Sequence, residues 1–321
     1  MPHAVEAEGL VKKFGQSVAV ADVSLTVPEG TVLGVLGPNG AGKTTTVRML
    51  TTLIRPDGGH ARVAGADVVK QADEVRRRIG VSGQYAAVDE YLTGFENLDM
   101  IGRLYHLGGK ASKTRAKELL AQFRLEDAAN RPAKTYSGGM RRRLDLAGAL
   151  VARPPVIFLD EPTTGLDPSK REDMWGVVRA LVADGSTVLL TTQYLEEADA
   201  LADEISVIDR GRVIAHDTPD GLKRVVGGQT LVVRPADAAR VSDVSAILSD
   251  VTGGQPDALS KGVVSVPVSG DGVLGPVVGR LDAAGIAVTE LSLRLPSLDE
   301  VFFTLTGRTE AAAPVREAVP A

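Results

Sequence analysis

The chain has 321 residues, no cysteine, 44% hydrophobic and 24% charged residues, and a net charge of −5. This length is typical of about two domains, and the apolar fraction excludes a disordered or fibrous chain. The lack of cysteine excludes disulfides, thiolate metal ligands and a cysteine nucleophile, and the charge argues against a nucleic-acid partner. Because no apolar run approaches a membrane span and no secretory signal is visible, we expect a soluble, intracellular protein.

Strand-like and helix-like segments alternate over the first two-thirds of the chain. In chain order we expect antiparallel strands within 5–27, a buried strand at 31–36, a helix at 42–53 with Val47, Leu50 and Leu53 on one side, a mostly helical stretch at 92–128, a helix at 138–152, a buried strand at 155–159, a helix at 168–184, a buried strand at 186–190 and a helix at 194–202. This alternation predicts a parallel sheet covered by helices, with antiparallel strands at its side and a helical insert.

A domain boundary is expected near Gly227-Gly228, because lysines are scattered before it and only Lys261 follows it. Beyond it we expect strands at 229–234, 262–268 and 286–293 and helices at 236–249, 271–284 and 297–306, which form a small α+β domain of ferredoxin-like type. The predicted organisation is a first domain of residues 1–226 with a helical insert at about 85–150, an accessory domain of residues 227–307 and a disordered tail of residues 308–321.

A phosphate-binding loop stands between the buried strand at 31–36 and the helix after it. Its residues, Gly37, Pro38, Asn39, Gly40, Ala41, Gly42, Lys43 and Thr44, match the pattern G-x-x-x-x-G-K-[ST]. The glycines let backbone N–H groups surround a phosphate at the positive end of the helix. Lys43 is suited to the β- and γ-phosphates, and the Thr44 hydroxyl is suited to Mg²⁺.

Two adjacent carboxylates, Asp160 and Glu161, follow the buried strand at 155–159. Ligands bind at this end of the strands in open α/β sheets, where two acids need a cation or a proton-transfer role. We expect Asp160 to hold Mg²⁺ and Glu161 to activate the water that attacks the γ-phosphate. The alternative for these acids, a simple helix cap, is weakened by the phosphate loop elsewhere in the chain.

A second anion cradle is predicted where Ser137, Gly138 and Gly139 begin a helix. With Gln84 between the two cradles and Asp167 after the acidic pair, the first 226 residues resemble the ATP-binding cassette (ABC) family. The resemblance implies a P-loop cassette with a parallel sheet core, an antiparallel β subdomain and a helical subdomain, which binds ATP and Mg²⁺.

The resemblance also implies a role for each matching residue. Residues 37–45, with Thr45 as the last, are the Walker A loop, and Asp160 with Glu161 forms Walker B and the catalytic base. Ser137, Gly138 and Gly139 belong to the signature motif, Gln84 is the Q-loop glutamine that reaches Mg²⁺ with Thr44 and Asp160, and Asp167 is the D-loop aspartate. Phe14 occupies the place of the aromatic residue that stacks on adenine, although an aromatic at a strand end is more often part of a core.

Two positions depart from the family pattern. Met140 stands where the signature usually has glutamine, and Gln193 stands where the family has a switch histidine. Glutamine can hydrogen-bond a γ-phosphate but cannot carry a positive charge, so we expect a contact role and modest turnover. Arg143 lies at the family's usual arginine position, and the rest of Arg141–Arg143 is expected at the surface.

Three longer stretches resemble ATP-binding subunits of drug exporters of the daunorubicin/doxorubicin-resistance type. They are Thr135-Tyr-Ser-Gly-Gly-Met-Arg-Arg-Arg-Leu-Asp145, Thr191-Thr-Gln-Tyr-Leu-Glu-Glu-Ala-Asp199 and Leu295-Pro-Ser-Leu-Asp-Glu-Val-Phe302. The third could form domain core or a dimer or partner contact, and Phe302 and Phe303 favour core over a drug pocket.

This resemblance implies a homodimer of cassettes with ATP at the interface, and a separate integral membrane permease as partner. Such a protein is peripheral, at the cytoplasmic face of the cell membrane, and hydrolyses ATP to drive export of a drug or other lipophilic compound. Two alternatives stay open: a soluble ABC ATPase that acts on ribosomes or nucleic acid, and a nucleotide-gated binding module without catalysis. The intact Glu161 argues against the second of these.

Overall fold

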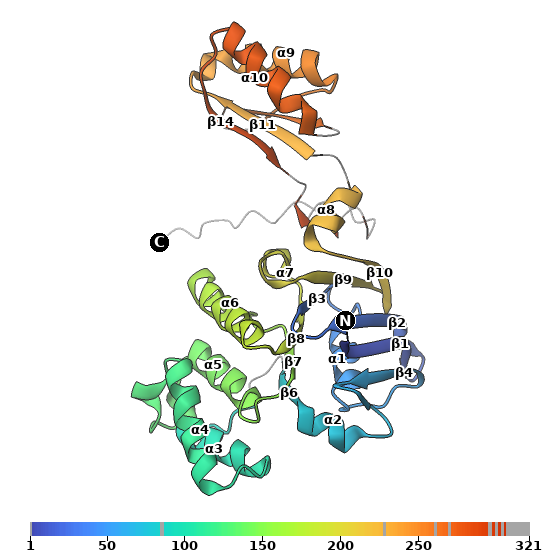
Figure 1. Ribbon diagram of the computed structural model, residues 1–321, viewed down its shortest axis with the longest axis vertical. Helices are drawn as coiled ribbons and strands as arrows, with labels where there is room; N and C mark the ends of the chain where they lie inside the picture. The colour runs from blue at the N-terminus through green and yellow to red at the C-terminus, as the bar shows by residue number, and fades with distance from the viewer. Residues whose placement is uncertain are drawn as a thin grey trace, which may run out of the picture. The chain divides into compact units, whose positions relative to one another are not determined.

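The computed structural model describes residues 2–83, 87–226, 229–259, 262–268 and 271–294, together with residues 297, 298, 301, 302 and 305. The chain divides into two compact units, residues 1–219 and residues 220–321 (Figure 1). The predicted tail at 308–321 lies outside the described residues. Within the described part of the chain, no helix is both long and apolar enough to cross a bilayer.

The first unit is built on a ten-stranded mixed sheet in the order β5-β4-β1-β2-β10-β9-β3-β8-β7-β6. Its strands are β1 (His3–Phe14), β2 (Ser17–Pro28), β3 (Val32–Leu36), β4 (Gly58–Val63), β5 (Ala66–Asp67), β6 (Ile79–Ser82), β7 (Val156–Asp160), β8 (Thr187–Thr192), β9 (Glu204–Asp209) and β10 (Arg212–Asp217). Strands β9, β3, β8, β7 and β6 run parallel to one another, whereas β10 pairs antiparallel with β9, and β1 pairs antiparallel with β2 and β4. The predicted parallel core and antiparallel side strands are both confirmed.

Helices lie along the parallel part of this sheet and beyond its β6 edge (Figure 1). They are α1 (Lys43–Leu50), α2 (Ala72–Arg78), α3 (Gly94–Leu104), α4 (Gly109–Gln122), α5 (Gly138–Ala149), α6 (Pro168–Ala183) and α7 (Leu195–Leu201). Helix α8 (Pro219–Val226) begins at the last residue of this unit and lies otherwise in the second unit. Helix α3 starts at a capping box, because the Thr93 side chain accepts from the Glu96 backbone N–H and Glu96 reaches back to Thr93. Helices α3, α4 and α5 all lie between β6 and β7 in the chain.

The first predicted helix ends earlier than its apolar spacing suggested. Helix α1 ends at Leu50, and Leu53 is 67% exposed instead of sharing the buried side of Val47 and Leu50. The reason is local: Thr52 adopts a left-handed backbone with φ of 64°, and the Leu53 backbone N–H donates back to the Arg48 carbonyl at 2.9 Å, which turns the chain away.

Apolar side chains of the sheet and its helices form two buried clusters. One includes Leu33, Val47 and Phe158, and the other includes Leu119, Leu144 and Leu190. The strands β3, β7 and β8 are buried at every position, as expected for parallel strands with both faces covered. The carboxyl ends of these strands are therefore held rigidly, which fixes the loops that follow them.

The second unit is a βαββαβ fold with a four-stranded antiparallel sheet in the order β12-β13-β11-β14. Its elements are β11 (Gln229–Pro235), α9 (Val241–Thr252), β12 (Asp257–Leu259), β13 (Val263–Val268), α10 (Leu274–Ala283) and β14 (Val288–Arg294). This order is that of a ferredoxin-like fold, so the α+β prediction is confirmed. The short strand β12 was missed, and α9 begins later than predicted because a 3₁₀ turn occupies Ala238–Arg240.

Near the end of this unit, Leu298 and Val301 are buried, which supports the interpretation of this stretch as core. Phe303 lies outside the described residues.

Candidate nucleotide site

The ends of three parallel strands lie level with one another and bring three predicted segments together. In the sheet, Leu36 of β3 pairs with Thr192 of β8, and Thr191 pairs with Asp160 of β7. The phosphate loop, the acidic pair and Gln193 each begin at or immediately after these paired residues. Since ligands of open α/β sheets bind at the carboxyl ends of the strands, this edge is the candidate site.

The phosphate loop needs glycine at both of its ends. A Cβ atom on Gly37 would lie 2.2 Å from the Ile208 carbonyl oxygen, which is far inside van der Waals contact. Gly42 adopts a left-handed backbone with φ of 109°, and a Cβ there would meet the Ala19 carbonyl oxygen at 2.7 Å. Both glycines are therefore fixed by close backbone approach as well as by the turn they form.

Lys43, the first residue of α1, lies beneath this loop and is 4% exposed. Its ammonium group donates to the carbonyl oxygens of Gly37 at 2.7 Å and Pro38 at 3.3 Å, and lies 3.8 Å from the Glu161 carboxylate. Burial lowers the pKa of Lys43, and the nearby charges of Glu161 and Asp160 oppose that shift. The loop therefore holds a buried amine at the point where phosphate charge would be neutralised.

Thr44 and Asp160 meet across the gap between α1 and β7. The Thr44 hydroxyl donates to Asp160 Oδ1 at 3.2 Å, and the Thr191 hydroxyl donates to the same oxygen at 2.5 Å. Asp160 is buried, so its orientation is fixed from two sides. A hydroxyl and a carboxylate oxygen this close together fit Mg²⁺, which takes oxygen ligands from one or two side chains and completes its shell with phosphate and water.

Glu161 follows Asp160 with an uncommon left-handed backbone, φ of 50°. Its backbone N–H donates to the Thr191 carbonyl at 3.0 Å and to the Thr191 hydroxyl at 3.1 Å, and the Thr164 hydroxyl donates to Glu161 Oε2 at 3.2 Å. Such a conformation costs about 1–3 kcal/mol and persists only where the surroundings hold it. The strain therefore marks a carboxylate whose direction is specified by its neighbours.

The predicted second cradle lies on a different part of the unit. Ser137 caps α5 by accepting from the Met140 backbone N–H at 3.3 Å, and Ser137 and Gly138 are exposed. Figure 1 shows α1 and α5 apart from one another, on either side of β7 and β8. A cavity of about 500 Å³ opens beside Ser137 and Gly139, and no residue of the phosphate loop lines it. The structure therefore does not bring the two cradles together within the described part of one chain.

Asp167 caps helix α6, near the second cradle. Its side chain accepts from the Lys170 backbone N–H at 3.0 Å and forms an ion pair with the Lys170 ammonium group. The methylenes of Lys170 pack against Gly139, where a Cβ atom would lie 3.1 Å from Lys170 Cδ. The predicted signature residues and the helix that Asp167 caps thus line one cavity.

Phe14 lies at the exposed end of the β1–β2 hairpin, so the interpretation as core is wrong. Its ring is 53% exposed, and the Lys12 ammonium group lies 5.6 Å from the ring centre. Phe14 pairs with Ser17, two residues before Ala19, whose carbonyl contacts Gly42 of the phosphate loop. An exposed aromatic ring at the end of the hairpin whose β2 strand contacts the loop fits the predicted contact with a base.

Of the two predicted glutamines, the structure describes Gln193. Gln193 follows the last residue of β8 and is partly exposed, and the Tyr194 backbone N–H after it donates to the Thr192 hydroxyl at 2.9 Å. The guanidinium of Arg171 lies 4.7 Å from the centre of the Tyr194 ring, which ties this turn to α6. Gln84 lies outside the described residues.

Sequence reasoning missed two buried charged residues of α5. Arg142 was expected at the surface, but it is 8% exposed and its guanidinium donates to carbonyl oxygens around Asp160 and Glu161. Asp145 is also buried, and it accepts from the Ser82 hydroxyl at 2.6 Å and the Ala87 backbone N–H at 2.7 Å. The available signal was an aspartate within the apolar run Leu144–Leu150, three residues after an arginine on the same helix.

The sequence matches the family described as ABC transporter over residues 20–164. It is 57% identical to the daunorubicin resistance ATP-binding protein DrrA2 of Streptomyces coeruleorubidus, over 96% of this chain and 97% of that protein. It is 46% identical to the doxorubicin resistance ATP-binding protein DrrA of Mycobacterium tuberculosis, over 94% and 93% of the two chains. The Nod factor export ATP-binding protein I of Burkholderia lata is 38% identical over 96% of this chain and 99% of that protein.

Solved structures of ATP-binding cassettes also match this chain, over about two-thirds of its length. A dimeric ATP-binding cassette in a post-hydrolysis state, bound to ADP and phosphate, matches with a TM-score of 0.62 and 28% identity, over 67% of this chain and 98% of that chain. An ATP-binding subunit of an ABC transporter matches with a TM-score of 0.64 and 28% identity, over 69% and 92%. The chain is therefore an ATPase and belongs to the ATP-binding proteins of the ABC transporter family, in the group that includes the daunorubicin and doxorubicin resistance proteins.

Proposed function

We propose that this chain powers export of a drug or other lipophilic compound through a separate membrane permease, at the cytoplasmic face of the membrane. The observation that supports this most is the presence of two anion cradles on separate faces of one chain, which a second copy can complete. Relatives named for drug resistance and for Nod factor export support the direction of transport. ATP hydrolysis is the energy source.

In the proposed dimer, two copies meet head to tail, so that ATP lies between the phosphate loop of one and Ser137–Gly139 of the other. ATP then favours the closed state, because it contacts both copies only there. The similarity to a dimeric cassette bound to ADP and phosphate supports this arrangement. Loss of the γ-phosphate removes one contact and lets the dimer open.

The residues at the strand ends support a hydrolysis mechanism with separate tasks. Lys43 neutralises phosphate charge, and Thr44 with Asp160 would hold Mg²⁺, which supplies further charge neutralisation when bound. Glu161 accepts a proton from the attacking water as its oxygen bonds to the γ-phosphorus and the bond to the ADP oxygen breaks. The left-handed backbone of Glu161 directs the carboxylate for this task.

Gln193 is expected to contribute a γ-phosphate contact. Replacing Gln193 with Ala should lower kcat by about tenfold, since one hydrogen bond to a charged group contributes roughly 1.5 kcal/mol or more. Steady-state phosphate release and ATP affinity, measured side by side, test this. If both are unchanged in Gln193→Ala, the contact role is wrong.

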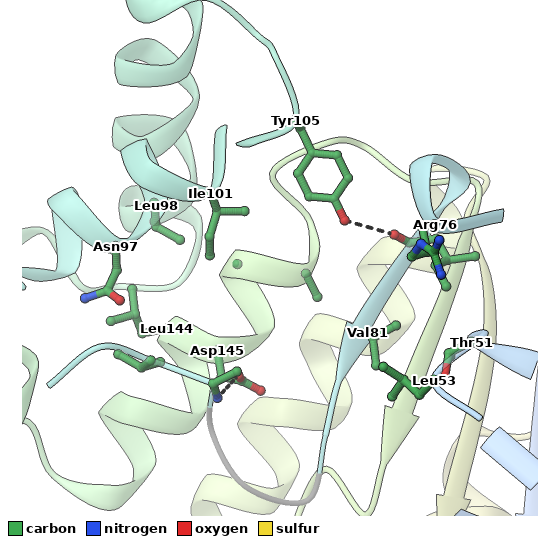
Figure 2. A pocket seen from close by; sticks show the side chains of 15 residues that line it. Thr51, Leu53, Arg76, Val81, Asn97, Leu98, Ile101, Tyr105, Leu144 and Asp145 are labelled. Atoms are coloured by element: carbon green, nitrogen blue, oxygen red, sulfur yellow. Dashed lines mark hydrogen bonds between the residues drawn. The ribbon is translucent and has the colours of Figure 1, made fainter. Parts of the chain in front are cut away.

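A groove on the first unit fits a segment of the permease. A cavity of about 310 Å³ lies among β6, α3 and α5 and is lined by apolar side chains that include Leu53, Val81, Ile101 and Leu144 (Figure 2). The Tyr105 hydroxyl donates to the Ile79 carbonyl at 3.4 Å, which links α3 to β6 beside the cavity. We define these lining residues as the α3–β6 groove.

The α3–β6 groove borders the predicted nucleotide site through Asp145. This carboxylate lines the groove and also bonds Ser82 and Ala87, which lie before and after residues 84–86 in the chain. A partner seated here would contact the carboxylate that joins Ser82 to Ala87, on either side of Gln84 in the chain. Leu53 at 67% exposed and Val81 at 37% exposed supply the apolar contact that a membrane protein's loop or helix would cover.

Replacing Leu53 with Asp should weaken association with the permease without changing basal ATP hydrolysis. We expect a loss of about tenfold or more in affinity, equivalent to ~1.4 kcal/mol, because a charge would enter an apolar contact. Co-purification from membranes with a candidate permease encoded beside this chain measures the effect. The matched control is Ile214→Asp, which changes an exposed apolar side chain on β10, outside the groove.

Two outcomes would contradict the proposal. Equal co-purification of Leu53→Asp and Ile214→Asp would remove the groove from the interface. Recovery of the parent chain with ribosomes, and with no membrane protein, would support the ribosomal alternative in place of export.

A further inference from the structure

The side chain of Arg142 lies at the centre of the carbonyl groups that surround the predicted catalytic base. Its Nε donates to the Pro162 carbonyl at 2.9 Å, and its Nη2 donates to the carbonyls of Asp160 at 3.2 Å and Glu161 at 3.1 Å. Its Nη1 donates to the Gly83 carbonyl, and lies 3.7 Å from Asp145 Oδ2. One guanidinium thus contacts three consecutive residues, the last residue of β7 and the two that follow it.

The burial of this guanidinium makes the contacts specific. Arg142 is 8% exposed, and burial lowers its pKa, although the charges of Asp145, Asp160, Glu197 and Glu161 oppose the shift. The planar fork of arginine offers five N–H donors in fixed directions, which a lysine cannot reproduce. Removing it would take a donor from the carbonyls of Asp160, Glu161 and Pro162, of which that of Glu161 keeps the Thr164 backbone N–H at 3.3 Å.

Glu161 is held on both sides of its strained backbone. Thr191 accepts from its N–H, and Arg142 donates to its carbonyl oxygen. A left-handed backbone in a non-glycine residue needs such external support, and it sets the direction in which the side chain leaves the chain. Arg142 therefore supports the backbone that orients the Glu161 carboxylate, together with Thr164, whose backbone N–H donates to the same carbonyl at 3.3 Å, and Arg142 does not itself need to touch nucleotide.

We propose that Arg142 is a positioning residue for Glu161 and ties the helix that begins with the signature motif to the base of the same chain. The inference rests on the proposed role of Glu161 as the base. Asp145 completes the connection, because it is on the same helix and bonds Ser82 at the end of β6. Helix α5 thereby fixes the position of Glu161 relative to Ser82, two residues before Gln84.

The test compares Arg142→Gln, Arg142→Lys and the parent chain in steady-state ATP hydrolysis. A displacement of the base by about 1 Å should lower kcat by roughly 100-fold, with KM for ATP little changed because no nucleotide contact is lost. Arg142→Lys should recover part of kcat, since its ammonium group can still reach some of the carbonyls. Arg115→Lys is the matched control: Arg115 also donates to a backbone carbonyl, that of Leu150 at 2.9 Å, but lies on α4 away from the base.

A double-mutant cycle separates positioning from a general loss of structure. In a Glu161→Gln background, adding Arg142→Gln should not lower the residual hydrolysis further, because the group being positioned is already absent. A further loss in the double variant, or wild-type kcat in Arg142→Gln, would overturn the inference. Retained hydrolysis in Glu161→Gln alone would instead remove the proposed base itself, so the two failures are distinguishable.

Discussion

Replacing Glu161 with Gln is expected to abolish steady-state ATP hydrolysis while ATP binding remains. The two side chains have nearly the same size, and the amide oxygen can still accept from the Thr164 hydroxyl, so the local structure should persist. An amide cannot take the proton of the attacking water, and loss of a general base lowers the rate by roughly 10²–10⁴-fold. Phosphate release and equilibrium binding of a fluorescent ATP analogue measure the two properties separately.

The control for this variant is Glu29→Gln, which makes the same change at an exposed turn before β3. We expect that variant to hydrolyse ATP at the parent rate. Steady-state hydrolysis by Glu161→Gln at a comparable rate would exclude Glu161 as the base.

Replacing Lys43 with Ala should cause the largest loss of ATP affinity. The ammonium group is buried and already lies among acceptors, with the Gly37 carbonyl at 2.7 Å and the Glu161 carboxylate at 3.8 Å. Loss of its bonds to phosphate should cost about 3 kcal/mol, which corresponds to roughly 100-fold in affinity. Binding of the fluorescent ATP analogue measures the change directly.

Lys43→Arg is the informative companion, because it retains the charge. The rigid, planar guanidinium is larger than an ammonium group, and a Lys43 site enclosed by carbonyls does not offer it room. We expect Lys43→Arg to bind ATP more weakly than the parent chain as well. ATP affinity equal to that of the parent in Lys43→Ala, with a folded protein by circular dichroism, would contradict the account of the phosphate loop.

The parts of the site that the sequence predicts are those encoded by short, contiguous stretches. The residues Gly37–Thr44 specify both a turn and the start of a helix. Asp160 and Glu161 follow a run of apolar residues that is typical of a buried strand. The register that places Leu36, Asp160 and Thr192 at one level follows from the parallel sheet, which the alternation of segments also predicts. Local pattern and sheet topology therefore agree here.

The parts that were not predicted depend on contacts between distant segments. The burial of Arg142 depends on the carbonyls of Asp160–Pro162, which lie on another element and give no signal within the helix sequence. The end of α1 depends on the left-handed backbone of Thr52 and the bond from the Leu53 N–H back to the Arg48 carbonyl, which apolar spacing does not reveal. The position of β9 and β10 between β2 and β3 is likewise set by long-range pairing, which no spacing in the sequence specifies.

In the proposed dimer, ATP joins two copies of this chain by contacting the phosphate loop of one copy and Ser137–Gly139 of the other. Light scattering of the Glu161→Gln variant after size exclusion, with and without MgATP, tests this dimer most directly, because that variant is expected to bind ATP without hydrolysing it. The account predicts a mass near twice the 33.6 kDa of one chain with MgATP, a monomer without it, and a monomer with MgATP when Ser137→Arg is added. A monomer in Glu161→Gln at saturating, demonstrably bound MgATP would contradict it.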